Sequence, residues 1–132
     1  MGLFSKSKES KFKDLFVDYM NLLASVSYRE ISIESAAPRI TEYKRDLIFL
    51  ARQFSDPCTS YFKLYSSQTT VLGEKTSIAE GVVIALLALE YVTSGHRLSN
   101  SAQNWIVNQA RIQCSTVDGR NATKELILKS NP

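Results

Sequence analysis

Histidine is almost absent from this 132-residue sequence, since His96 is the only one. Cysteine is nearly as scarce, with two residues in the whole sequence. These two, Cys58 and Cys114, lie far apart and do not form a CxxC motif. The chain therefore offers few soft ligands for a transition metal. It also has no GxSxG turn, and the stretch Gly73-Glu-Lys-Thr lacks the earlier glycine of a GxxxxGK[ST] phosphate loop. These absences argue against catalysis, and we expect no metal, no cofactor and no enzymatic activity.

Strong net charge and long apolar runs are also missing. Sixteen basic and thirteen acidic residues leave a net charge of +3, which is too small to demand a nucleic acid or an anionic membrane as partner. The most apolar stretch, 77–95, contains two glutamates and falls short of the roughly 20 residues that span a bilayer. The first residues also lack the apolar core of a secretory signal. We therefore expect a cytoplasmic protein with buried, reduced cysteines.

The most informative feature that is present is the stretch 77–95. Ser77 and Glu80 match the reciprocal capping box that begins a helix, and Gly95 supplies the matching end. Between them the helix is apolar on almost every side, so neighbouring elements must cover it. This predicts an all-α fold, a single compact bundle of five or six helices around a buried central helix at about 77–94.

Three helices are expected before the central one. An amphipathic pattern predicts the first, and residues 29–37 form a connector, as a loop or a short extended piece. Pro38 suits the first turn of a second helix, and Asp56 followed by Pro57 suits the start of a third. The predicted ranges are 10–28, 38–54 and 56–72.

Two helices are expected after the central one. The first begins near Ser99 or Ser101 and directs Trp105 inward. A turn at Asp118-Gly119 then precedes a short terminal helix capped by Asn121, with a hairpin as the alternative.

Lysine is concentrated at the N-terminus. We expect residues 1–9 to be a flexible basic tail, followed by a single helical domain over 10–130. A solvated tail explains these lysines best, while phosphate binding is an alternative and an anionic membrane surface is favoured least. The lysines of this basic arm are Lys6, Lys8, Lys11 and Lys13.

Two aromatic residues fall outside the apolar stripes of their predicted helices. Phe49 lies in a polar face with Arg45 and Arg52, and Phe62 points about 100° away from its aromatic neighbours. Large aromatic residues outside a core are enriched at binding surfaces, although a second core layer would use them equally well. These four residues are candidate partner contacts, with Trp105 as a weaker anchor.

The two glutamates of the central helix do not form a catalytic pair in this interpretation. Ten residues of helical rise place Glu80 and Glu90 about 15 Å apart, too far to act on one bond. Glu80 is expected in the helix cap, Glu90 in an ion pair or at the surface, and His96 in a loop.

The leading hypothesis is a small non-enzymatic intracellular protein that binds another protein, as an adaptor, a chaperone-like factor or a stoichiometric inhibitor of the immunity type. The alternative is a nucleic-acid-binding protein that uses the basic arm and the basic face of the second helix, formed by Arg39, Lys44, Arg45 and Arg52. An enzyme comes third. The identity of the partner and the oligomeric state stay open.

Overall fold

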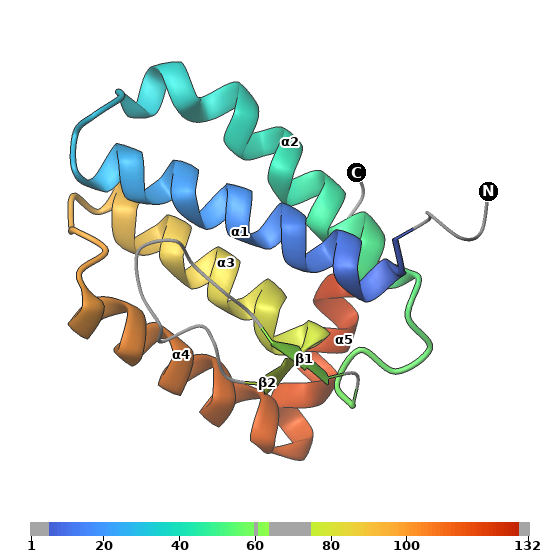
Figure 1. The fold of residues 1–132 in the computed structure, drawn as a ribbon. Coiled ribbons are helices and arrows are strands. Elements are labelled where there is room, and N and C mark those ends of the chain that lie inside the picture. The colour runs from blue at the N-terminus through green and yellow to red at the C-terminus, as the bar shows by residue number, and fades with distance from the viewer. Residues whose placement is uncertain (1–5, 60, 64–74, 130–132) are drawn as a thin grey trace.

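In the computed structural model, helix α3 (Ile78–Thr93) lies between α1 (Lys8–Ser27) and α4 (Asn100–Ser115) (Figure 1). Its capping box forms as predicted. The Ser77 hydroxyl accepts from the Glu80 amide at 3.1 Å, and the Glu80 carboxylate accepts from the Ser77 amide at 3.0 Å. Nine of the sixteen residues of α3 are buried, so the prediction of a covered central helix is confirmed.

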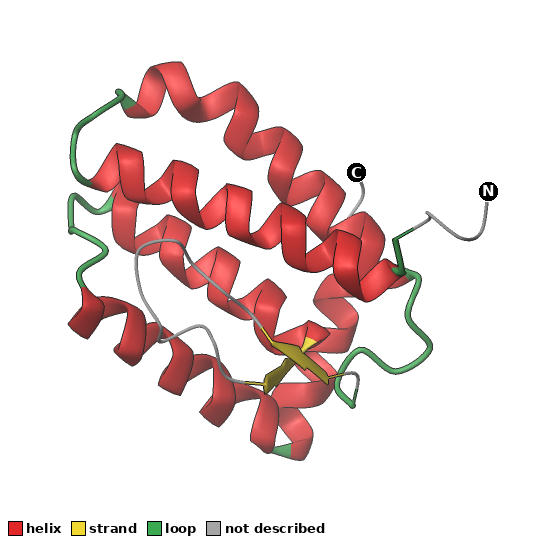
Figure 2. Cartoon of the chain, in the orientation of Figure 1, coloured by secondary structure: helices red, strands yellow, loops and turns green. Residues whose placement is uncertain are grey.

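The structure describes residues 6–59, 61–63 and 75–129, and within these ranges five helices pack into one bundle (Figure 2). The predicted all-α class is therefore confirmed. A two-stranded antiparallel sheet accompanies the helices, with Phe62 paired to Thr76. The remaining elements are α1 (Lys8–Ser27), α2 (Ile33–Arg52), β1 (Tyr61–Lys63), β2 (Lys75–Ser77), α4 (Asn100–Ser115) and α5 (Val117–Lys129).

The core forms where α1 packs against α3. Phe12 and Phe16 are fully buried, with ring centroids 6.5 Å apart, and Tyr19 is fully buried one turn further on. The Tyr19 hydroxyl donates to the carbonyl of Ala85 in α3 at 3.4 Å. Burial of each such aromatic side chain stabilises the fold by about 1.5–3 kcal/mol. Helix α1 thus covers one side of α3, and α4 packs against it as well.

Helix α2 begins five residues before its predicted start, so the assignment of Pro38 to the first turn is wrong. Ser32 is the N-cap, and its hydroxyl accepts from the Ser35 amide at 3.1 Å. Pro38 instead lies inside the helix. Its missing amide removes one bond to the carbonyl four residues earlier. The extra turn is retained because it has its own cap and buries Ala36.

The predicted helix over 56–72 does not form in the described residues of that segment. The Asp56 carboxylate accepts from the Cys58 amide at 3.1 Å, which closes a turn, and β1 follows. Pairing of β1 with β2 competes with helix formation here, and the Ala79 amide donates to the Pro57 carbonyl at 3.1 Å. The prediction for 64–72 lies outside the described residues.

Helix α1 begins at Lys8, two residues before its predicted start. Ser7 is its N-cap, since the hydroxyl accepts from the Ser10 amide at 3.1 Å. Lys8 and Glu9 therefore belong to the helix and not to a tail, and residues 1–5 lie outside the described part.

The predicted turn at Asp118-Gly119 is also wrong, because both residues belong to the first turn of α5. Thr116 separates α4 from α5 and caps the start of α5, because its hydroxyl accepts from the Gly119 amide at 3.0 Å. The terminal helix itself is confirmed, with a start four residues earlier than the predicted cap at Asn121.

Candidate functional site

The outer face of α2 carries an exposed aromatic residue between two arginines. Arg45, Phe49 and Arg52 follow the spacing i, i+4, i+7, which places them on one side of the helix. We call these three residues the α2 outer face. Phe49 has 51% of its surface exposed. Arg45 lies 3.4 Å from Asp46 and 4.0 Å from Glu42, so its charge is balanced by carboxylates on the same helix.

Phe62, the other aromatic residue predicted outside the core, packs against the core instead. Its ring meets the fully buried Phe12 edge-on, with centroids 5.6 Å apart. Phe62 lies on β1 and not on a helix, so the helical angle used to place it at the surface does not apply. Phe62 is therefore partly buried at the edge of the core.

Trp105 of α4 is 50% exposed, so the prediction that it points inward is wrong. It lies beside two other rings. Its centroid lies 6.2 Å from that of Tyr91 in α3, and Tyr91 lies 4.8 Å from His96 in the following loop. A cavity of about 220 Å³ opens at this cluster, and we call it the Trp105 cavity. The turn between α3 and α4 assembles the cluster, so the sequence indicated Trp105 but not its neighbours. The residues lining the cavity are Leu87, Glu90, Tyr91, Ser94, His96 and Trp105.

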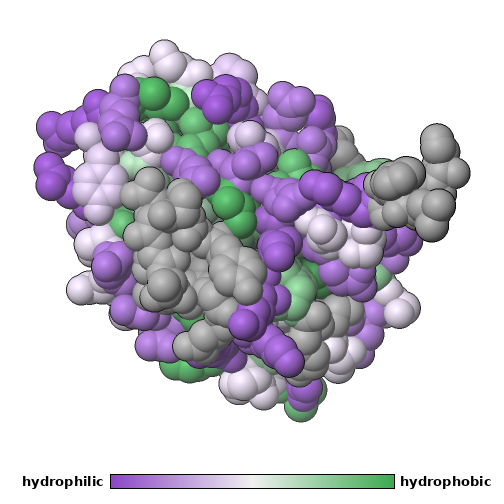
Figure 3. Space-filling view, in the orientation of Figure 1, coloured by the Kyte–Doolittle hydropathy of each residue, from purple (hydrophilic) through white to green (hydrophobic). Residues whose placement is uncertain are grey.

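A larger groove runs between α1 and α2, which we call the α1–α2 groove. It consists of two adjoining cavities of about 410 and 400 Å³, which share Asp18, Arg39 and Tyr43. Glu42 and Asp46 add two carboxylates to the first cavity. The sequence did not predict this groove, because its walls come from two helices whose residues are distant in the sequence. On the viewed face of the molecule, hydrophilic residues cover most of the described surface, with hydrophobic areas between them (Figure 3).

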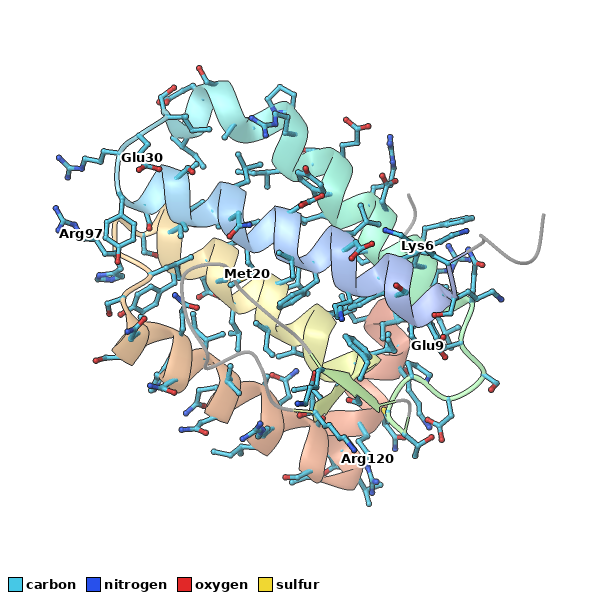
Figure 4. All side chains as sticks on the ribbon, in the orientation of Figure 1. Lys6, Glu9, Met20, Glu30, Arg97 and Arg120 are labelled. Atoms are coloured by element: carbon cyan, nitrogen blue, oxygen red, sulfur yellow. The ribbon has the colours of Figure 1, made fainter. Side chains whose placement is uncertain are left out.

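The basic arm lies mostly on α1 and its charge is partly balanced. Lys6 forms an ion pair with Asp14, and the bond and charge of Asp14 raise the pKa of this lysine. Lys8, Lys11 and Lys13 are residues of the helix. Lys6 and Glu9 lie at one end of the molecule and Arg97 and Glu30 at the other (Figure 4). The arm is therefore far from the loop that contains His96.

The two cysteines are free, and neither is activated as a nucleophile. Cys114 is buried, and burial raises the pKa of its thiol to about 11. Cys58 is half-buried, and burial raises its pKa as well. A reactive cysteine needs a lowered pKa, because the thiolate is the attacking form. The surroundings of both thiols raise the pKa instead of lowering it.

The glutamates of α3 have separate surroundings. Glu80 is occupied by the cap and lies 4.0 Å from Arg111, whereas Glu90 is exposed at the Trp105 cavity. Among the described residues, no group of three His, Cys, Asp or Glu side chains is placed to hold a metal ion. None of the described helices combines the length and apolar character needed to cross a membrane.

Comparison of the chain with protein-family models, curated proteins and solved structures gives no match.

Proposed function

We propose that this protein binds another protein through the α2 outer face, with Phe49 as the anchor. The observation that carries the proposal is the exposure of the Phe49 ring, since Phe12 and Phe16 are fully buried. Burial of an exposed phenylalanine against a partner is worth about 1.5–3 kcal/mol. An adaptor, a chaperone-like factor or a stoichiometric inhibitor would each use such a contact.

The surroundings of Phe49 fit the periphery of a protein interface. Asp46 precedes it by one turn and Glu42 by two turns, and both line the α1–α2 groove. Two carboxylates of the helix that carries Phe49 thus line an open groove, with Arg39 on the same wall. An aromatic anchor with polar and charged groups of both signs around it is typical of protein interfaces.

The charge distribution favours a protein over a nucleic acid as partner. Binding to phosphates needs a concentration of positive charge with few carboxylates nearby. Here Arg45 has Asp46 and Glu42 beside it, and Lys6 is paired with Asp14. These carboxylates lower the positive potential of both basic regions, so the nucleic-acid alternative receives less support.

Photo-crosslinking at Phe49 tests the proposal. With p-benzoylphenylalanine at position 49 in native host cells, irradiation should yield a discrete adduct with one protein. The same group at Ile112, which is 60% exposed on α4, is the control and should yield none. Phe49→Ala should change the free energy of unfolding by no more than about 0.5 kcal/mol and should reduce recovery of the adduct partner at least about tenfold.

Three results would contradict the proposal: no adduct at position 49, equal adducts at both positions, or a large loss of stability in Phe49→Ala. A gel shift with DNA or RNA that weakens steeply with salt and persists in Phe49→Ala would favour the nucleic-acid alternative instead.

A further inference from the structure

We propose that the Trp105 cavity binds an alkylammonium cation. The cavity is formed by the end of α3, the start of α4 and the loop between them, so it does not involve the α2 outer face (Figure 1). The inference therefore goes beyond the proposed function and stands independently of it.

The arrangement of the three rings leaves aromatic surface open to a ligand. The plane of Tyr91 is tilted by 40° against His96 and by 36° against Trp105, so the rings are not closely stacked in parallel. Half of the Trp105 surface is exposed. The faces of aromatic rings carry negative electrostatic potential, and tryptophan attracts cations most strongly. Organic cations are the ligands that such a group of rings favours.

A carboxylate completes the site. Glu90 lines the same cavity and is exposed, and within the described ranges no cation forms an ion pair with it. The arginine nearest in sequence to the loop histidine, Arg97, lies over the ring of Tyr28 at 5.7 Å. A cation that enters the cavity would thus contact the negative charge of Glu90 in addition to the rings. Arg97 contacts the ring of Tyr28 instead.

The size of the cavity limits the ligand to a small head group. Its volume of about 220 Å³ is below the roughly 300–1,000 Å³ typical of sites for drug-sized molecules. Leu87 adds an apolar wall suited to methyl or methylene groups. Quaternary or primary alkylammonium groups combine this size, charge and apolar surface. Such a group could belong to a free amine or to a lysine side chain.

Fluorescence offers a direct test, because Trp105 is the only tryptophan of the chain and reports on this cavity alone. The full-length protein is titrated with choline and with 3,3-dimethylbutan-1-ol, which has nearly the same shape without the charge. We expect a saturable change in emission with choline and at least a tenfold weaker response to the alcohol. Sodium chloride at matched ionic strength should produce no saturable change.

A charge-neutralising variant separates the site from nonspecific effects. Glu90→Gln should weaken choline binding about fivefold to tenfold, whereas Glu125→Gln, which alters an exposed carboxylate on α5, should leave it unchanged. Equal binding of the alcohol, or equal affinity in Glu90→Gln, would overturn the proposal. The Phe49 experiment is unaffected by any of these results.

Two further probes identify the source of the cation. Choline is compared with a short peptide that contains trimethyllysine and with the same peptide containing unmodified lysine. Saturable binding of any of the three supports the ammonium site, and the tightest one distinguishes a free amine from a lysine side chain. Failure of all three would refute it.

Discussion

Two buried hydroxyl groups of this protein differ in their hydrogen bonding. The Ser27 hydroxyl donates to the Ala24 carbonyl at 2.9 Å and accepts from the Leu98 amide at 3.3 Å, so it joins α1 to the loop before α4. Thr76 is more deeply buried than Ser27, yet its hydroxyl has no hydrogen-bond partner within the described part of the chain. An unpaired buried hydroxyl costs about 1–3 kcal/mol, which makes Thr76 a local weakness of the fold.

Removing these two hydroxyls should therefore have opposite effects. Thr76→Val replaces an unpaired hydroxyl with a methyl group of similar shape and should raise the free energy of unfolding by about 1 kcal/mol. Ser27→Ala leaves the Leu98 amide without its acceptor and should lower it by about 1–2 kcal/mol. Urea denaturation of both variants measures the effects. A loss of stability in Thr76→Val would show that the hydroxyl is satisfied.

At the scale of elements, the corner between α4 and α5 depends on Gly119. A methyl group added to this glycine would lie 1.6 Å from the carbonyl oxygen of Gln113, at the end of α4. The two helices can turn within one residue only because Gly119 lets the backbones approach this closely. In the sequence, Asp118-Gly119 looked like an ordinary turn, because close approach between backbones leaves no local pattern.

Replacing Gly119 with alanine should lower the stability of the protein, although alanine has the higher helix propensity. Alanine is the better helix former by about 1 kcal/mol, but the clash with Gln113 should make Gly119→Ala destabilising by at least about 3 kcal/mol. Gly95 is the matched control, since nothing lies within 4 Å of its added methyl group and only its φ of +88° opposes alanine. Gly95→Ala should cost about 1–2 kcal/mol.

The midpoints of thermal unfolding, measured by circular dichroism, rank the two glycine variants. If Gly119→Ala is as stable as Gly95→Ala or more stable, the close approach of the two helices does not occur in solution.

At the scale of the whole molecule, burial of two weak acids ties stability to alkaline pH. Burial raises the pKa of Tyr19 above its ordinary value of 10.0, and it raises the pKa of Cys114 from 9.0 to about 11. A raised pKa in the folded state means that the neutral form is favoured there. The contribution of these neutral groups to the free energy of unfolding is fully present below the pKa of the unfolded state. It is lost as the pH rises through the pKa of the folded state. The fold should therefore weaken from about pH 9 upward.

Tyr19→Phe tests this dependence, because phenylalanine cannot ionise. At pH 7 the variant should be less stable by about 0.5–1.5 kcal/mol, since it loses the bond to Ala85. Above pH 10 its stability should fall less steeply than that of the wild type. Urea denaturation from pH 7 to pH 11 measures both slopes, with Tyr28→Phe on the surface as the control. Parallel slopes for wild type and Tyr19→Phe would contradict the expectation.

The sequence by itself determined the central helix and the class of the fold. Ser77 and Glu80 form a cap from residues three positions apart, and an apolar surface on almost every side of 78–93 is stable only under neighbouring helices. Both properties are local, so the periodicity of apolar residues and the capping residues were sufficient to predict the central helix and the all-α class. The same logic failed at Pro38, where the cap at Ser32 and burial of Ala36 outweighed the preference of proline for a first turn.

Only the tertiary structure decided which aromatic residues remain exposed. Phe49 and Phe62 looked alike in the sequence, yet Phe12 covers Phe62 while no such ring contact covers Phe49 among the described residues. In the same way, Tyr91 and Trp105 meet only because the chain reverses between α3 and α4. Exposure depends on what lies opposite a side chain, and the opposite residue is distant in the sequence. The local pattern indicated the α2 outer face without separating Phe49 from Phe62, whereas the Trp105 cavity depends on packing that no local pattern encodes.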